Sequence, residues 1–259
     1  PLPTWLPVAG VAPSPVTALL HAAVLVKIGV YVYARLLVVT LPLADVWHIV
    51  VPALAAFSAI VAAGAALIET DLKRIIAYST ISQIGFIFLG FAVGGQLAVA
   101  GALLYILMHG LAKGGLFLCA GIVEQKTHTK DISKMGGLIA SMPFTAVSFI
   151  ICDFSVMGIP PLGGFFSKYA VIAGTVATGH YWMAFAYLVT AVLTIIYLMR
   201  VFVMVFMGEA KGRTPAEGSP LMVFSVALLA FLSLASGLVI SPSFGFARAA
   251  AQQMLGFIK

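Results

Sequence analysis

Long apolar stretches separated by short polar breaks run through almost the whole chain. Each stretch is close to the roughly 20 residues that an α-helix needs to cross a bilayer core of about 30 Å. The pattern therefore predicts an all-α integral membrane protein, a polytopic bundle of about seven or eight transmembrane helices. The predicted helices span residues 16–40, 47–69, 72–93, 97–123, 140–180 with a break near the middle, 182–207 and 221–240.

The end of the chain has a different pattern. Residues 1–245 are predicted to form a single transmembrane bundle, whereas 246–259 alternates apolar Phe246 and Leu255 with basic Arg248. Such a segment is typical of a helix that lies in the membrane interface. We therefore expect an amphipathic interfacial tail.

The composition agrees with a lipid environment. Hydrophobic residues make up 62% of the chain and charged residues 8%, whereas soluble domains are about 45–50% apolar. The net charge of +6 does not predict a nucleic-acid partner, because the basic residues are scattered between apolar spans. Cys119 and Cys152 lie inside apolar runs without ligand spacing, so we expect neither a metal site nor a disulfide framework. We also expect no cofactor.

Basic residues alternate along the chain with the predicted helices. They collect in the loops 69–74, 124–139 and 208–219, whereas the other connections contain no Lys or Arg. Positive loops of membrane proteins face the cytoplasm. The pattern predicts a multi-pass protein of the cell (inner or cytoplasmic) membrane with these three loops on the cytoplasmic side.

One predicted helix carries a strong break, the sequence GIPPLGGFFSK. Pro160 and Pro161 remove backbone donors, and Gly163 and Gly164 loosen the helix. In a membrane, the freed carbonyls are tolerated when they are buried in protein or line a hydrated cavity. The break therefore indicates an ion path, and a simple kink without a role is the alternative.

A polar stripe crosses the fourth predicted helix. Tyr105, His109 and Lys113 follow one another at four-residue steps, which puts them on one helical face. An intramembrane lysine costs about 2.5–3.5 kcal/mol on insertion scales. Lys113 lies too deep to reach the interface easily, so we interpret the stripe as a candidate proton relay.

Four further ionisable groups, Lys168, Asp153, Lys27 and His21, are candidates for the same relay. Lys168 follows the broken segment, and its alternative role is a structural salt bridge with Asp153. Lys27 lies mid-helix in the first full span. It is six residues from His21 and so does not share its face. A lone histidine in an apolar span is as often a packing residue as a functional one.

Six strings are recognisable in order along the chain: PLPTWLP, PSPVTALLHAAVLVKIGVYVYARL, ETDLKRIIAYSTISQIGF, MHGLAKGGLFLCAGIV, KMGGL and GIPPLGGFFSK. Together they closely resemble the antiporter-like membrane subunits shared by respiratory complex I, multisubunit (Mrp-type) cation/proton antiporters and energy-converting membrane-bound hydrogenases. The likeness covers residues 1 to about 210.

The resemblance implies a fold of two inverted repeats, each with one broken helix. This chain would hold the second repeat and its flanking helices, the C-terminal part of such a subunit. The family's channel lysine then falls on Lys168, its bridging lysine and histidine on Lys113 and His109, and the histidine of the helix before the second repeat on His21. Lys27 occupies a position that is lysine in some branches of the family.

Departures from the family pattern limit this transfer. Tyr105 stands where some members have a second histidine, and Asp153 stands where a small neutral residue is expected. A lysine and a glutamate of the first half-channel would lie upstream of Pro1, so we expect the chain to be part of a longer protein.

Three functions follow as hypotheses. The leading one is translocation of protons, or Na⁺, by a Lys/His relay in a multisubunit redox-driven pump or cation/proton antiporter. Its partners would be the lipid bilayer and other membrane subunits, including further antiporter-like subunits. In a redox-driven complex, a hydrophilic redox arm would be a further partner. The alternatives are a non-conducting structural arm that anchors partners, and a stand-alone solute transporter. The sequence shows no enzyme motif, so any bond chemistry belongs to other subunits of a translocase or oxidoreductase complex.

Overall fold

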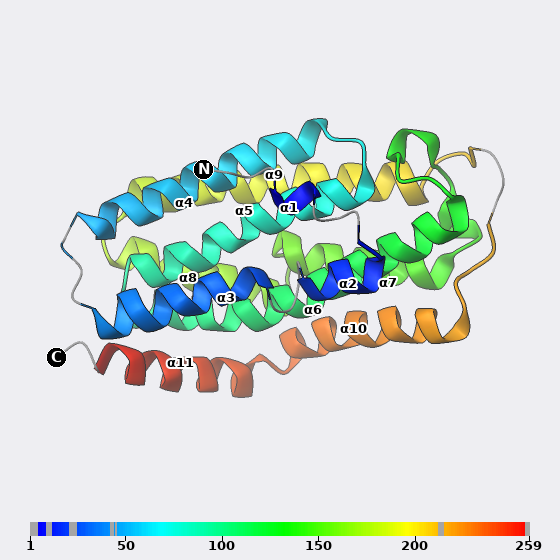
Figure 1. Ribbon diagram of the computed structural model, residues 1–259. Helices are drawn as coiled ribbons and strands as arrows, with labels where there is room; N and C mark the ends of the chain where they lie inside the picture. Colours follow the sequence, from blue (N-terminus) through cyan, green and yellow to red (C-terminus); the bar gives the residue numbers. More distant parts are fainter. Residues whose placement is uncertain are drawn as a thin grey trace.

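The computed structural model describes residues 5–8, 12–20, 25–41, 44, 46–211 and 215–256, and its long helices lie along one common direction (Figure 1). In chain order the helices are α1 (Trp5–Val8), α2 (Ser14–Ala18), α3 (Leu25–Val32), η3 (Tyr33–Thr40), α4 (Trp47–Ile68), α5 (Leu72–Ala92), α6 (Gln96–Thr127), η4 (Ile132–Lys134), η5 (Leu138–Ala140), α7 (Pro143–Met157), α8 (Gly163–Ala177), α9 (Tyr181–Phe206), α10 (Pro220–Leu238) and α11 (Ile240–Gly256).

The predicted fold class, an all-α membrane bundle, is confirmed. Among the described residues, the five helices α4, α5, α6, α9 and α10 are long and apolar enough to cross a membrane. The only β-type pairing in the same residues is an isolated bridge between Asp71 and Asp131. The total of seven or eight spans stays a prediction.

The fifth predicted span is two half-helices, as the sequence indicates. α7 and α8 have 15 residues each, which at 1.5 Å per residue is about 22 Å, too short for either to cross alone. α7 ends at Met157 and is capped by Gly158, whose φ of 85° lies in the left-handed region that glycine adopts without strain. The break occupies residues 158–162, and Gly163 begins α8.

The two ends of the chain differ from the expected helices. The first predicted span, 16–40, is divided into α2, α3 and the π-helix η3, and His21 lies outside the described residues. The terminal helix α11 begins at Ile240 rather than 246, continues from α10 and packs against α6 (Figure 1). Its placement in the membrane interface stays a prediction.

α6 lies at the centre of the bundle and contacts α5, α7, α8, α10 and α11. Small residues allow this close packing, as is usual between membrane helices. A Cβ on Gly101 of α6 would lie 2.7 Å from the backbone nitrogen of Val171 on α8. The half-helix α8 is therefore held directly against α6, where the polar stripe runs.

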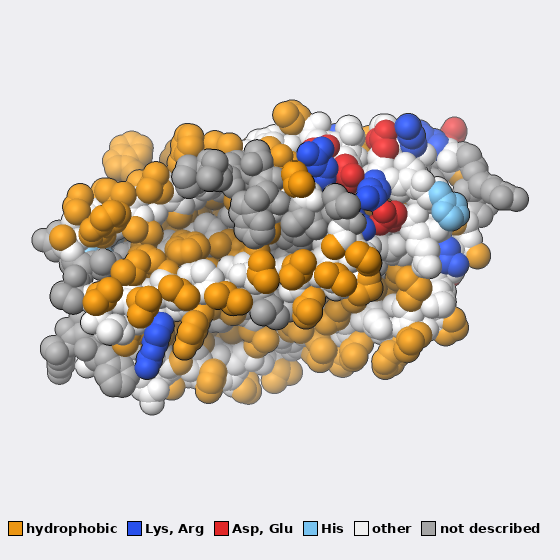
Figure 2. Space-filling view, in the orientation of Figure 1, with side chains coloured by type: hydrophobic (Ala, Val, Ile, Leu, Met, Phe, Trp, Pro, Cys, Tyr) orange, Lys and Arg blue, Asp and Glu red, His pale blue; other side chains and the backbone are white. Residues whose placement is uncertain are grey.

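Charged side chains gather at one end of the molecule, where α4 joins α5 and α6 joins α7 (Figures 1 and 2). The amine of Lys73 lies 2.5 Å from Glu124, and Lys130 lies 3.3 Å from the same carboxylate. The Lys73–Glu124 pair ties the start of α5 to the end of α6. The described parts of all three basic loops lie at this end.

Candidate functional site

The polar stripe predicted on α6 lies inside the protein. Tyr105, His109 and Lys113 are each at most 1% exposed. They lie on the face of α6 that meets α5 and α8, so they cannot reach lipid or bulk water directly. The four-residue spacing read from the sequence therefore places three polar groups in the core of the bundle.

Lys113 is anchored on α5. Its amine donates to the backbone carbonyl of Ile76 at 3.1 Å and to the hydroxyl of Ser79 at 2.5 Å. A lysine amine has up to three hydrogen atoms to donate. Two of them have acceptors here, which explains how a fully buried lysine is tolerated.

A hydrogen-bonded network extends from Ser79 along α5 and α9. Tyr197 donates to Ser79 at 3.0 Å, and Gln83 donates to Tyr197 at 3.4 Å and to Thr194 at 3.0 Å. Tyr105 closes the network by donating to the amide oxygen of Gln83 at 2.7 Å. A continuous set of polar contacts therefore joins Lys113 to Tyr105.

Sequence reasoning missed the α5 and α9 members of this network. Ser79 and Gln83 stand four residues apart in YSTISQIGF, the same spacing that drew attention to α6. Thr194 and Tyr197 are three residues apart on α9. Polar pairs at helical spacing in these apolar helices were the available signal.

Lys168 is anchored on the broken helix. Its amine donates to the carbonyl of Val156 at 2.6 Å and to that of Met157 at 3.4 Å. Because α7 stops at Gly158, these carbonyls have no further helical turn to bond. The amine also lies 4.7 Å from the ring centre of Phe86 and 5.7 Å from that of Tyr105, within the range of cation–π attraction.

The two glycines that begin α8 have close neighbours. A side chain on Gly163 would meet Met108 of α6, and one on Gly164 would meet the backbone of Ser155. Pro160 and Pro161 form the turn between the half-helices. The break thus lets α8 pack tightly while it presents carbonyls to Lys168.

His109 lies between the two lysines without a hydrogen bond of its own. Neither ring nitrogen has a partner among the described residues, and the ring meets that of Tyr105 edge-on, 5.8 Å between centres. The charges of Lys27, Lys113 and Lys168 all act on His109. The structure therefore brings together the histidine and lysines that the sequence singled out.

Asp153 is fully buried on α7 and has no hydrogen-bond partner for either oxygen among the described residues. The salt bridge with Lys168 that the sequence suggested is not formed, because the Lys168 amine contacts backbone carbonyls instead. Asp153 is thus a buried carboxylate without a direct partner among these residues.

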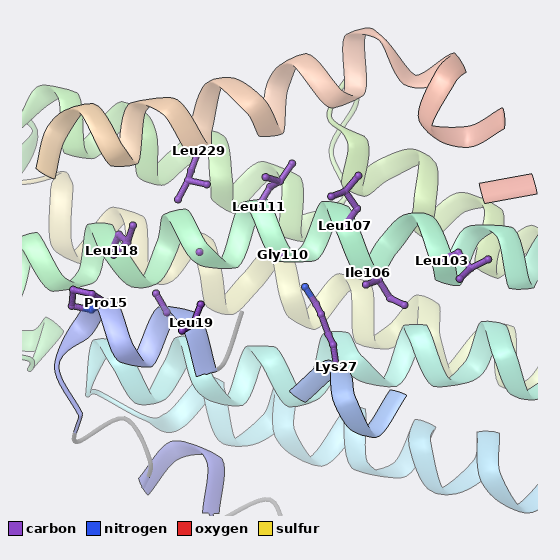
Figure 3. Close-up of a pocket in the computed structure, with 12 residues that line it drawn as sticks. Pro15, Leu19, Lys27, Leu103, Ile106, Leu107, Gly110, Leu111, Leu118 and Leu229 are labelled. Atoms are coloured by element: carbon purple, nitrogen blue, oxygen red, sulfur yellow. The ribbon is translucent and has the colours of Figure 1, made fainter. Parts of the chain in front are cut away.

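Lys27 approaches the stripe from the outer side of α6. It lines a mainly apolar groove of about 660 Å³ between α2, α6 and α10, with Leu107, Gly110 and Leu229 on the facing walls (Figure 3). The side chain extends from α3 toward Gly110 (Figure 3). No hydrogen bond or ion pair of Lys27 joins it to another described residue.

Comparison with known proteins places this arrangement in a family. The NADH:quinone oxidoreductase/Mrp antiporter transmembrane model matches residues 1–194. The chain is 33% identical to a Na⁺/H⁺ antiporter subunit of Alkalihalophilus pseudofirmus over 98% of its own length and 52% of that protein. It is 38% identical to an NADH-quinone oxidoreductase subunit of Escherichia coli over 93% of its own length and 39% of that protein.

Solved structures share the fold. The Mrp complex from Dietzia contains a chain with a TM-score of 0.90 at 23% identity, over 97% of this chain and 55% of that one. Respiratory complex I from Thermus thermophilus contains one with a TM-score of 0.85 at 27% identity, over 98% and 55%. The chain spans about half the length of these relatives or less. It belongs to the NADH:quinone oxidoreductase/Mrp antiporter transmembrane family.

Proposed function

We propose that this chain translocates protons across the membrane as part of an antiporter-like subunit in a multisubunit complex, either a redox-driven ion pump or a cation/proton antiporter. The observation that carries the proposal is the pair of buried lysines, Lys113 and Lys168, on either side of the unpaired His109. The two lysine charges act on each other and on His109. An intramembrane ionisable group is a functional hypothesis by default, and here three are clustered.

The proposed relay runs from Lys113 through His109 to Lys168. An amine and an imidazole can each bind and release one proton. His109 can accept a proton at one ring nitrogen and release one at the other, since neither nitrogen is held by a described protein group. The carbonyls of Val156 and Met157 then accept hydrogen bonds from the protonated Lys168.

Internal water would complete the route. Buried polar groups are almost always hydrogen-bonded to protein or to ordered water. Besides His109 and Asp153, the hydroxyls of Ser82, Ser155 and Ser233 are buried and have no partner among the described residues. We infer that water molecules bind these groups and link the relay residues to one another.

The remaining assignments extend the same proposal. Lys27, together with His21, would pass protons between the stripe on α6 and the part of the protein that relatives carry beyond this region. Other membrane subunits, further antiporter-like subunits among them, are the proposed partners, with a hydrophilic redox arm if the complex is redox-driven. The three basic loops are proposed to face the cytoplasm, since they share one end of the bundle.

The test is Lys168→Ala in the complete protein within its complex. We expect ion translocation in native membrane vesicles to be abolished while the complex still assembles, because the proton site is lost. Lys73→Ala is the matched control, since both lysines are 4% exposed. Lys73 pairs with Glu124 at the charged end, so its loss should leave translocation per assembled complex unchanged.

Unchanged ion flux in the assembled Lys168→Ala variant would overturn the proposal and favour the non-conducting structural arm. Measuring proton flux with and without Na⁺ in the same vesicles decides which ion crosses. If the flux requires Na⁺ to bind at the relay residues, and not only as the exchanged ion, the result would argue against proton transfer between the lysines.

A further inference from the structure

Asp153 is the buried ionisable group that the proposed relay does not use. It lies on α7, fully buried, and neither carboxylate oxygen bonds another described residue. An isolated carboxylate in a low-dielectric interior is very costly unless a cation or hydrogen bonds compensate it. The structure therefore calls for a compensating group near Asp153.

Two lysines are candidates for that group. Lys168 is committed elsewhere, because its amine donates to the carbonyls of Val156 and Met157. Lys113 lies on α6, which packs so closely on α7 that a Cβ on Gly115 would overlap the sulfur of Cys152. Asp153 is the next residue after Cys152, so this contact brings its part of α7 against the Lys113 region of α6.

The surroundings of Asp153 agree with this geometry. Its charge acts on Lys113 and Cys119 of α6 and on Tyr197 of α9. Tyr197 and Lys113 meet at the hydroxyl of Ser79, to which both donate. Asp153 thus adjoins the cluster that holds the Lys113 amine, whereas Lys168 is not among the groups on which it acts.

We infer that Asp153 is the internal counter-ion of Lys113, a carboxylate on α7 that faces the ammonium on α6 without direct contact. The inference rests on the proposed function and adds a positioning residue to it. The carboxylate holds Lys113 protonated at rest. When Lys113 passes its proton to His109, the negative charge of Asp153 favours return of a proton to the same amine.

The first test is a thermal-stability cycle on the purified complete complex. Lys113→Met and Asp153→Asn should each lower the apparent unfolding midpoint by several degrees, because each leaves the other charge buried and uncompensated. The unfolding midpoint of the double variant should be lowered by no more than that of the more strongly destabilised single variant. Asp153→Asn combined with Lys168→Met is the matched control and should be additive, as expected of groups that do not interact.

If the losses of thermal stability in Lys113→Met and Asp153→Asn add up in the double variant, the inference is overturned. The cycle measures stability and not transport. It can therefore disprove the counter-ion role while the proposed translocation still holds, and the flux assay can disprove translocation while the counter-ion role still holds. A spectroscopic readout covers the case in which a variant assembles poorly. In assembled Lys113→Met, infrared spectra should gain the carbonyl band of a protonated carboxylic acid that is absent from Lys113→Met/Asp153→Asn.

The conservative variant separates charge from packing. Asp153→Glu keeps the carboxylate and should restore most of the translocation that Asp153→Asn loses. Cys152→Ser changes the neighbouring buried side chain without a charge and should leave translocation unchanged. Loss of translocation in Asp153→Glu equal to that in Asp153→Asn would mean that shape, not charge, matters at this position.

Discussion

At the scale of single residues, the site depends on hydrogen-bond acceptors that carry no charge. Each of the amines of Lys113 and Lys168 is held by backbone carbonyls or a hydroxyl, and Asp153 contacts neither amine directly. Neutral acceptors stabilise an ammonium less than a direct carboxylate does. A proton held this way can leave more easily than one locked in a salt bridge, which suits a relay.

Ser79 is the residue at which this idea is most directly tested. Ser79→Ala removes an acceptor shared by Lys113 and Tyr197, and an unsatisfied buried donor costs about 1–3 kcal/mol. We expect reduced thermal stability together with slower proton translocation. Thr80→Val is the control, because the equally buried Thr80 hydroxyl bonds its own helix at Ile76. Equal effects of both changes on translocation would contradict the role of Ser79.

The sequence predicted the charged members of the candidate site and Tyr105, but it missed the other neutral members. His109 and Lys113 stand out because histidine and lysine are rare and costly in lipid. Ser79, Thr194 and Tyr197 do not, since hydroxyl residues are common between membrane helices and usually bond their own backbone. Their role depends on which helices are neighbours, and a single sequence does not show which helices pack together.

At the scale of elements, the interrupted helix decides the geometry. Helix ends were predictable within a few residues where Pro, Gly or a charge cluster marks them, as at Asp71, which caps α5 by accepting from the Arg74 amide. The division of the first span and the start of α11 were not, because no comparable signal marks them. The break at residues 158–162 was predictable, because prolines and glycines mark it and the start of α8.

The close packing at the break makes a steric prediction. A Cβ at Gly164 would overlap the backbone carbonyl of Ser155, so Gly164→Ala should push the half-helices apart. Overpacking of this kind costs about 1–3 kcal/mol, and we expect lower thermal stability of the complex and weaker translocation.

Gly64→Ala on α4 is the matched control for this prediction. Apart from its own stretch of helix, no described atom lies within 4 Å of the position of its Cβ, and Ala is favoured over Gly inside a helix by roughly 0.5–1 kcal/mol. Stability should therefore stay the same or rise. A Gly164→Ala complex as stable and active as wild type would show that the contact between α7 and α8 is not needed.

At the scale of the whole molecule, charge is separated along the axis of the bundle. The connections from α4 to α5, α6 to α7 and α9 to α10 share the end where charged side chains gather (Figures 1 and 2). Large apolar side chains such as Phe57 in the middle of α4 and Phe231 in the middle of α10, 64% and 63% exposed, cover the flanks. Such a distribution fits a protein surrounded by lipid and neighbouring apolar helices, with one strongly charged end in water.

Which side of the membrane holds that charged end can be measured with single cysteines. Lys134 is well exposed at the charged end, and Gln96 is exposed at the start of α6, at the opposite end. The native cysteines Cys119 and Cys152 are buried, so they give little background labelling. A membrane-impermeant maleimide should label Lys134→Cys in inside-out vesicles only, and Gln96→Cys in right-side-out vesicles only.

This outcome follows from the energetics of insertion rather than from the fold, because a bundle of the same shape could sit in the membrane either way round. Lysine and arginine in short loops set the orientation by remaining on the cytoplasmic side. Labelling of Lys134→Cys in right-side-out vesicles would mean that the orientation is the opposite of the one proposed. The relay from Lys113 to Lys168 would keep its geometry, but the compartment that supplies each proton would be exchanged.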